Sequence, residues 1–276
     1  MVQILVRALP WLGGAARINR GPLWCDRPWT HAERGLFLHA LQRAARHHRW
    51  WYVRGAFEWP ENPDVRVLLL ENGWRPVQDG TAWGSHQLSL APDVAVLRQG
   101  LTGKWRNRLV KGERQESIVQ VGVNGKRWQQ LLQYYRIFQQ EKGFVGIATP
   151  LLERLPRQQG KFWRLDLLSA QARTAPDQSI ALLLSLHHGA VATYLIGLTT
   201  AEGRSLQANY VLLWQAILLA KAQGAAWFDL GGVNAETPEG IVHFKSGVGG
   251  TPYQLVGEWS WHPFSYRRAV GCNCPT

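Results

Sequence analysis

The sequence predicts an α/β (α+β) protein of two tandem units, in which mixed sheets are flanked by helices. Two observations favour this class. Short apolar strands bounded by Gly and Pro recur between helical stretches along all 276 residues. From residue 117 onward the expected order is β-α-β-β-β-α-β-α-β, and the first part follows a looser version of this plan, β-β-α-β-β-β. A chain of this length can bury a core in each of two units.

The first part opens with two short strands around a Gly-Gly turn, and a helix follows them. Thr30 and Glu33 have the spacing of a capping box, in which the hydroxyl and the carboxylate satisfy free amides of the first helical turn. The expected elements are strands at 2–9 and 14–19, a helix at 31–48, and strands at 51–57, 66–70 and 82–90.

The second part contains two long helices of different kinds. One carries an apolar stripe at helical spacing, which indicates a helix with one buried face. The other, which ends before Gly224, is apolar nearly all round and is expected to be buried. The expected elements are a basic helix at 94–115, a strand at 117–123, a helix at 125–142, strands at 162–169, 178–185 and 190–198, a helix at 208–223, a strand at 226–230, a helix at 237–247 and a strand at 252–260.

The composition limits the kinds of binding partner and the cellular compartment that we expect. The net charge of +12 favours an anionic partner, for which nucleic acid, a diphosphate-linked lipid and an anionic membrane face all qualify. A generally basic protein background is the alternative. No apolar run is long enough to span a bilayer and the opening residues do not form a signal peptide, so we expect a cytoplasmic protein. Three cysteines make no disulfide framework and suggest no metal site.

The first candidate site lies in the basic helix. Residues 104–114 hold five basic side chains and one acidic one. Helical spacing places Lys104, Arg108 and Lys111 on one face, and such a face suits phosphate oxygens. A basic helix that is simply solvated is the alternative.

The second candidate site follows the strand 226–230. Asp229 precedes Gly231 and Gly232, and two successive glycines allow the backbone to approach a ligand closely. The Asp229 carboxylate either accepts a proton or orients an amine, or it caps the next turn; the sequence leaves both roles open.

The third candidate site is a lysine followed by a glycine-rich run. Lys245 is preceded by Phe244 and followed by Gly247, Gly249 and Gly250. An ammonium held there is suited to stabilise the oxyanion of a tetrahedral intermediate in acyl transfer. A surface lysine at the end of a short helix is the alternative, and His243 is a weaker candidate for a base. No GxSxG, HExxH, P-loop or dinucleotide motif occurs in the sequence.

These segments together resemble the Fem aminoacyltransferase family (FemA, FemB, FemX). The most specific is the stretch from Phe228 to Gly250, which matches an aromatic-Asp-Leu-Gly-Gly turn followed by Gly-Ile-x-x-Phe-Lys-x-Gly-x-Gly-Gly. Three weaker matches add to it: NRGPLW at 19–24, LTGKWRNRLVKGER at 101–114 and NYVLLWQAILLAKAQGA at 209–225.

The resemblance implies two GNAT-like domains, at 1–116 and 117–256, the first completed by 257–276. It implies transfer of an amino acid from aminoacyl-tRNA to the peptide stem of a muropeptide or lipid-linked peptidoglycan precursor, with peripheral contact at the inner membrane face and with no cofactor or metal. It also assigns residues: Lys245, Phe244 and Asp229 to catalysis, and Lys104, Arg106, Arg108, Lys111, Tyr210, Gly231 and Gly232 to substrate binding.

Three departures from the family pattern are evident. The chain begins almost at its Arg-Gly-Pro segment, so we expect a first domain truncated at its N-terminus. No long charged helical hairpin interrupts the second domain, and Gly112 replaces the usual Ala of the basic helix.

Other functions remain open from the sequence. A CoA-dependent N-acyltransferase of the wider GNAT superfamily is the main alternative, although the segment GRSLQANYVLLW lacks the glycine pattern that cradles the CoA pyrophosphate. A protein-directed aminoacyl-tRNA transferase shares the expected chemistry. An RNA-binding module using the basic face and the 15 Trp residues is the non-enzymatic alternative.

Overall fold

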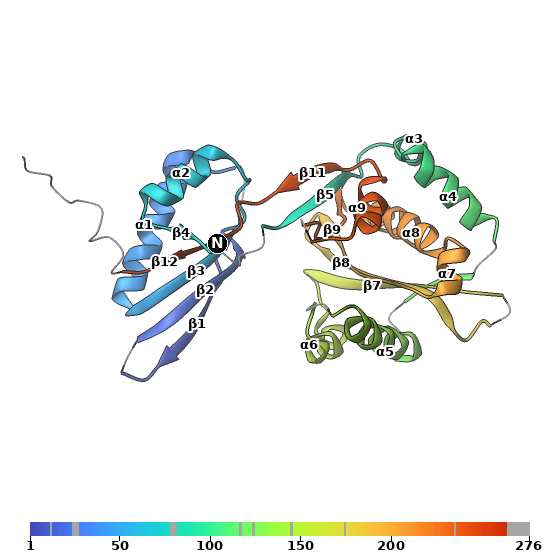
Figure 1. The fold of residues 1–276 in the computed structure, drawn as a ribbon, viewed down its shortest axis with the longest axis horizontal. Coiled ribbons are helices and arrows are strands. Elements are labelled where there is room, and N and C mark those ends of the chain that lie inside the picture. The colour runs from blue at the N-terminus through green and yellow to red at the C-terminus, as the bar shows by residue number, and fades with distance from the viewer. Residues whose placement is uncertain are drawn as a thin grey trace, which may run out of the picture. The chain divides into compact units, whose positions relative to one another are not determined.

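The computed structural model describes residues 1–11, 13–23, 28–77, 82–115, 118–122, 125–143, 146–173, 175–234 and 236–263 (Figure 1). The chain divides into two compact units. Unit 1 comprises Met1–Gly84 and Tyr253–Thr276, and unit 2 comprises Ser85–Pro252. Both are mixed α/β, so the predicted fold class is confirmed. No helix within the described ranges combines the length and apolar character needed to cross a bilayer.

The described part of unit 1 is one sheet with two helices. The strand order is β1-β2-β3-β12-β4, so the C-terminal strand β12 lies between β3 and β4 and is antiparallel to both. The β1–β2 pair is antiparallel and the β2–β3 pair is parallel. The elements are β1 (Ile4–Leu9), β2 (Gly13–Gly21), α1 (His31–His47), β3 (Trp50–Phe57), α2 (Pro63–Glu71), β4 (Arg75–Pro76) and β12 (Glu258–Trp261).

The N-terminus of α1 has the predicted capping box. The Thr30 side chain accepts a hydrogen bond from the Glu33 N–H, and the Glu33 carboxylate accepts one from the Thr30 N–H at 2.7 Å. The sheet, α1 and α2 share one core that is rich in tryptophan, with Trp59, Trp74 and Trp259 almost completely buried.

The strand expected at 66–70 is wrong, because these residues lie in α2. The Asn62 side chain caps the helix by accepting from the Val65 N–H at 2.8 Å, and Pro63 occupies the first turn. Val65, Leu68 and Leu69 are buried at helical spacing. A short apolar run has no clear period, so its apolar character fits a strand and a helix equally, and only the residues before it favour a helix.

Unit 2 is a larger sheet with helices on both faces. The strand order is β11-β5-β10-β9-β8-β7-β6. The β10–β9 pair is parallel, whereas β10–β5, β9–β8, β8–β7 and β7–β6 are antiparallel. The elements are β5 (Gly84–Ser89), α3 (Val94–Gln99), α4 (Gly103–Glu113), β6 (Ile118–Val121), α5 (Gly125–Lys142), α6 (Thr149–Arg154) with a 3-10 turn (Leu155–Gln158), β7 (Trp163–Gln171), β8 (Ser179–His188), β9 (Val191–Thr199), α7 (Ala201–Ser205), α8 (Ala208–Ala222), β10 (Trp227–Asp229), α9 (Glu239–Ser246) and β11 (Thr251–Gln254).

The two faces of this sheet pack into separate cores. Figure 1 shows α4 and α8 on one face and α5 and α6 on the other. Alternate residues of β7 follow this division: Leu165 and Leu167 join the α5 core, whereas Leu168 and Ala170 join the α8 core. The α8 helix is buried nearly all round, as its composition predicts.

The structure divides the chain earlier than the sequence suggests. The boundary expected between 116 and 117, two residues that lie outside the described ranges, falls within unit 2. The physical reason is the packing of α4, whose Trp105 and Leu109 are buried in the α8 core. The single basic helix expected at 94–115 is also two helices, α3 and α4.

Candidate active site

Among the described residues of α9, only Lys245 is buried. Only 8% of its surface is exposed, although it lies in the last turn of a short helix. Its Nζ donates a hydrogen bond to the Gly232 carbonyl at 2.8 Å and lies 5.3 Å from the centre of the Tyr194 ring. The ammonium is therefore turned into the protein, where it contacts a carbonyl dipole and an aromatic face.

The turn after β10 positions this carbonyl. Gly231 has a φ of +70°, and a β-carbon there would lie 2.4 Å from the Tyr194 carbonyl oxygen, so only glycine fits. Asp229 Oδ1 accepts from the Gly231 N–H at 2.8 Å and from the Ser85 hydroxyl at 2.7 Å. The Asp229 carboxylate therefore caps this turn, which is one of the roles that the sequence left open.

Burial shifts the titration of the groups around this turn. It lowers the pKa of Lys245 to about 8, and the Asp229 carboxylate partly opposes that shift. Burial also lowers the pKa of His86, followed by the effect of the Lys245 charge, again opposed by Asp229. His86 Nδ1 is buried and has no hydrogen-bond partner among the described residues. One cation, one carboxylate and an imidazole with a lowered pKa therefore interact around this turn.

An aromatic cluster joins α9 to the basic helix α4. Trp105 Nε1 donates to the Phe244 carbonyl at 2.9 Å, and the Tyr210 ring packs edge-on against both Trp105 and Phe244, with ring centres 5.1 Å apart. The Thr102 N–H donates to the Gly247 carbonyl at 2.9 Å. The start of α4 is therefore fixed against the end of α9, beside Lys245.

The close approach of α4 to α8 accounts for Gly112, one of the departures from the family pattern. A β-carbon at Gly112 would lie 2.7 Å from Val211 Cγ2 and 3.0 Å from the Gln207 carbonyl oxygen. An alanine there would force the two helices apart.

The predicted phosphate-binding side chains of α4 fall into two groups. Arg108 donates to the Tyr210 hydroxyl and lies over its ring, and Arg106 Nη2 donates to the Gln99 and Leu101 carbonyls at 3.0 Å. Lys104 and Lys111 are exposed. A surface hollow of about 500 Å³ gathers some of these side chains with others; its lining is Arg106, Asn107, Val110, Lys111, Arg114 and Gln115. Lys104 and Arg108 do not line it.

Three residues of the Lys245 environment have no signal in the sequence: Ser85, His86 and Tyr194. Ser85 and His86 lie on β5, which pairs with β10 in the register Asp229 to Gln87, and Tyr194 lies on β9. Only strand pairing brings them to the turn.

His243, considered as a base, is exposed, and its Nδ1 lies 3.9 Å from a Glu239 carboxylate oxygen. The described ranges contain no group of three His, Cys, Asp or Glu side chains that could hold a metal.

The fold is similar to that of FemX and of a tandem GNAT protein. A crystal structure of FemX aligns over 95% of this chain and 84% of its own, with a TM-score of 0.72 and 12% identity. A tandem GNAT protein from the clavulanic acid biosynthesis pathway aligns over 90% of this chain and 75% of its own, with a TM-score of 0.55 and 14% identity. The C-terminal domain of a putative lysylphosphatidylglycerol synthetase from Agrobacterium fabrum aligns over 94% of this chain and 83% of its own, with a TM-score of 0.54 and 10% identity.

Residues 163–269 match the model of the FemAB family, which confirms the resemblance to the Fem proteins. This range contains Asp229, Gly231, Gly232, Phe244 and Lys245. No curated protein sequence matches the chain.

Proposed function

We propose that the protein transfers an amino acid from aminoacyl-tRNA to the amine of the peptide stem of a peptidoglycan precursor. The observation that carries this proposal is the buried Lys245 ammonium, because burying a charged lysine costs stability and groups with strongly shifted pKa values cluster at functional sites. It lies in the range matched by the FemAB family model and is turned towards the glycine turn after β10.

In this reaction the acceptor amine attacks the ester carbonyl carbon of the aminoacyl-tRNA. A C–N bond forms, the C–O bond to the ribose breaks, and the amine proton leaves with the ribose oxygen. Negative charge develops on the carbonyl oxygen in between. The Lys245 ammonium has three N–H donors, and one of them binds the Gly232 carbonyl, so it can also donate to that oxyanion. With a pKa of about 8 it is mostly charged at neutral pH.

The hollow on α4 supports an RNA donor. Arg106, Lys111 and Arg114 line it without an acidic residue, and forked guanidinium groups suit phosphate oxygens. Since the aromatic cluster fixes the start of α4 against α9, a phosphate backbone bound there would lie on the same unit as Lys245.

The geometry of the α8 N-terminus argues against acyl-CoA as the donor. A CoA pyrophosphate needs glycines that leave backbone N–H groups open before a helix. The nearby glycine, Gly203, lies in α7, and a β-carbon on it would be 2.2 Å from the Ile180 carbonyl oxygen. This glycine serves the close contact with β8, and the residues that join α7 to α8, Leu206 and Gln207, are not glycines.

The direct test supplies the purified protein with charged tRNA and a muropeptide pentapeptide. We expect deacylated tRNA and a muropeptide heavier by one aminoacyl residue, measured by mass spectrometry. Acylation of the muropeptide from acyl-CoA and not from tRNA would overturn the proposal. If a protein is acylated from charged tRNA and the muropeptide is not, the proposed donor is supported and the proposed acceptor is wrong.

The α4 hollow is tested separately by tRNA binding. We expect Lys111→Gln and Arg114→Gln to weaken tRNA binding and to lower the dependence of log K on log salt by about 0.7–0.9 per lost phosphate contact. Lys126→Gln is the matched control, because Lys126 lies on α5 and is paired with Asp177 at 2.6 Å. An equal effect of all three variants would mean that only the net charge matters.

A further inference from the structure

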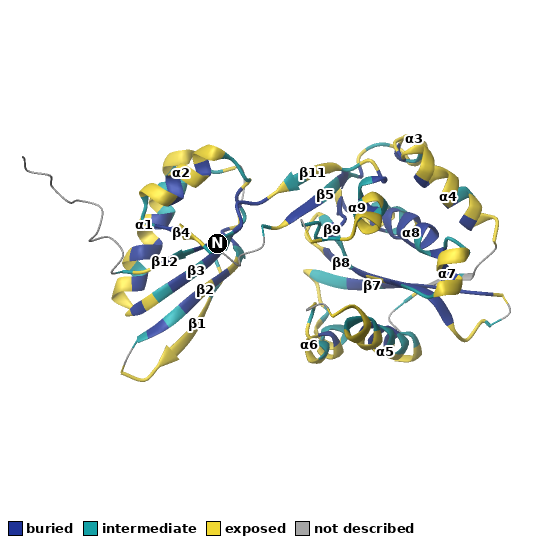
Figure 2. Cartoon of the chain, in the orientation of Figure 1, coloured by how far each residue is buried: buried dark blue, intermediate teal, exposed yellow. Residues whose placement is uncertain are grey.

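Lys245 differs from the other cations of the chain in its surroundings. Among the described residues it is the only buried Lys or Arg, although the rest of α9 is exposed or half-buried (Figure 2). Other cations that lie over aromatic rings, such as Arg98 over Trp214, reach solvent. A contact between a cation and a ring face gains strength when water is excluded, so the ring beside Lys245 has the larger effect.

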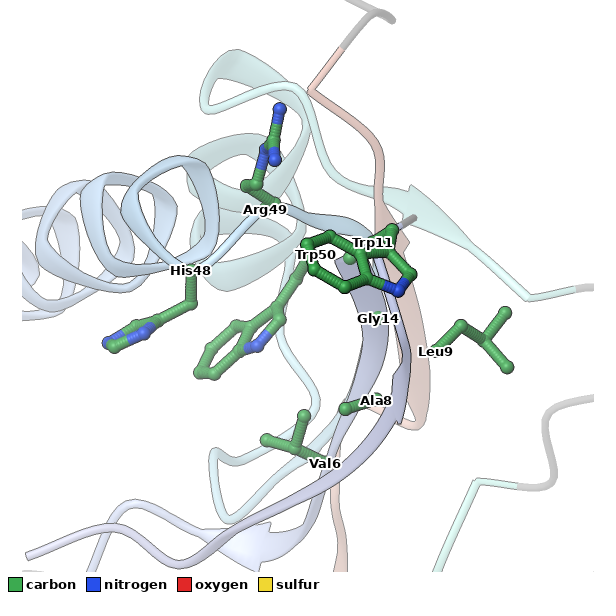
Figure 3. A pocket seen from close by; sticks show the side chains of 9 residues that line it. Val6, Ala8, Leu9, Trp11, Gly14, His48, Arg49 and Trp50 are labelled. Atoms are coloured by element: carbon green, nitrogen blue, oxygen red, sulfur yellow. The ribbon is translucent and has the colours of Figure 1, made fainter.

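The hollow at the β1–β2 hairpin of unit 1 shows the contrast (Figure 3). Among the side chains that line it, the rings of His48 and Trp50 are stacked with their centres 5.3 Å apart, and Arg49 is a permanent cation. His48 and Arg49 are both exposed, so water competes for their charges. We therefore expect no comparable effect of a ring on a protonation state there.

A β-bulge in β9 sets the direction of the Tyr194 side chain. The register of β9 against β8 shifts between Tyr194 and Ile196, which leaves Leu195 as the extra residue. Before the bulge, Ala192 and Tyr194 pack on the α8 core. After it, Ile196 and Leu198 join the α5 core. The bulge thus reverses the alternation of the strand and turns the Tyr194 ring to the face of the sheet on which α9 packs.

Gly197 leaves room for this ring. A β-carbon on Gly197 would lie 1.6 Å from the Tyr194 hydroxyl oxygen and 2.6 Å from Cζ, so any other residue would displace the ring. In the observed position the ring centre is 5.3 Å from Lys245 Nζ. Burial raises the pKa of the Tyr194 hydroxyl, so the ring carries no charge and acts on the ammonium through its face.

Few other groups in the described part of the chain influence this ammonium. The Asp229 carboxylate on β10 favours its charged form, whereas the charge of the ammonium itself lowers the pKa of His86 on β5. His243 on α9 is exposed, and Arg108 on α4 is engaged by the Tyr210 hydroxyl. The ring of Tyr194 is thus, beside the Asp229 carboxylate, a second group that stabilises the charge.

We propose that Tyr194 is a positioning residue for the transfer reaction: the face of its ring keeps the Lys245 ammonium charged and turned towards the glycine turn after β10. The inference rests on the proposed function for the reaction that the lysine serves. The contact between ring and ammonium can be tested without that reaction.

The experiment measures the pKa of Lys245 and the pH dependence of transfer. An NMR titration of isotope-labelled lysine gives the pKa, and Lys245→Met assigns the signal. Tyr194→Leu should lower this pKa by about one unit. Because the wild-type pKa is about 8, transfer should then fall about fivefold at pH 8 and stay nearly unchanged at pH 6. A variant that is only disturbed in its packing would lose transfer equally at both pH values.

Three companion variants separate the ring face from other effects. Tyr194→Phe keeps the face and should keep the wild-type pKa and pH profile. Gly197→Ala should reproduce the shift of Tyr194→Leu, because the added carbon displaces the ring without touching Lys245, and it serves as the test if Tyr194→Leu does not fold. Tyr134→Leu is the matched control, since Tyr134 packs partly buried on the α5 core, and we expect it to match the wild type.

Three results would overturn the proposal. One is a Lys245 pKa that stays unchanged or rises in Tyr194→Leu and Gly197→Ala. Another is a loss of transfer of the same size at pH 6 and pH 8. The last is an equal shift in Tyr194→Phe and Tyr194→Leu, which would assign the effect to the hydroxyl. If the pKa shifts as expected but the wild type transfers nothing, the proposed function is wrong and the contact between ring and ammonium is supported.

Discussion

Replacing Lys245 by methionine separates a catalytic lysine from a structural one. Methionine has a similar length and no charge, so it keeps the packing of α9 and removes the ammonium. A structural lysine stabilises the fold, and its loss lowers the free energy of unfolding. If the lysine is retained for chemistry in spite of the cost of its burial, its replacement leaves the free energy of unfolding unchanged or raises it.

The magnitude follows from the pKa of Lys245. Burial lowers it from 10.5 to about 8, and at about 1.4 kcal/mol per pKa unit the charged form is disfavoured by about 3 kcal/mol in the fold. The methionine variant loses this penalty but leaves the Gly232 carbonyl without its donor, which costs about 1–3 kcal/mol. At pH 7 we therefore expect the variant to be as stable as the wild type, or more stable by up to about 2 kcal/mol.

The same pKa sets the sign of the pH dependence. Because the folded-state pKa lies below the unfolded one, the unfolded wild type binds more protons between pH 8 and 10.5, and wild-type stability rises there. By pH 9.5 the wild type should gain about 2 kcal/mol relative to Lys245→Met.

Denaturant unfolding at pH 7 and 9.5, together with single-turnover transfer, measures both properties. Transfer should fall about 10²–10³-fold in Lys245→Met, the usual loss for an oxyanion donor. Lys221→Met is the control: Lys221 donates to the Leu90 carbonyl at 2.6 Å in the same unit, and this variant should keep transfer. A Lys245→Met protein that loses more than about 2 kcal/mol at pH 7 and still transfers would refute the reasoning.

Three further predictions concern the same turn. The kcat/KM of the wild type should decline above pH 8 as Lys245 loses its proton, and a rate unchanged to pH 9.5 would remove the ammonium from the mechanism. Gly231→Ala should lower the free energy of unfolding by several kcal/mol, since the β-carbon would lie 2.4 Å from the Tyr194 carbonyl oxygen. The control Gly224→Ala, at φ +85° with open space around it, should cost about 1 kcal/mol; equal costs would show that the clash relaxes freely. The pKa of His86, followed by NMR titration, should rise in Lys245→Met because the lysine charge is one cause of its depression; an unchanged value would place the two groups too far apart to interact.

Local signals in the sequence were sufficient for most of the elements. The capping box at Thr30 and Glu33 begins α1 as predicted, and the apolar composition of 208–223 predicted the buried helix α8. The apolar run at 66–70 failed because helix and strand are not distinguished by a few consecutive apolar residues. Asn62 and Pro63 carry the start signal that distinguishes this helix from a strand.

The candidate site divides in the same way. The sequence supplied Asp229, the glycine pair and Lys245, because they lie in one short segment with a recognisable spacing. It did not supply Ser85, His86 or Tyr194, which only the pairing of β5, β10 and β9 brings to that segment. The sequence also did not predict that Arg108 donates a hydrogen bond to Tyr210 on α8.

The sequence by itself determined the fold class, the order of most elements and the family of the segment around Lys245, since periodicity, capping and motif spacing are local properties. Only the tertiary structure decided that Lys245 is buried, that Asp229 caps a turn and that α4 belongs to unit 2. Burial and strand pairing depend on contacts between segments far apart in the chain. These contacts bury Lys245 and so shift its pKa, and they leave Trp11 exposed.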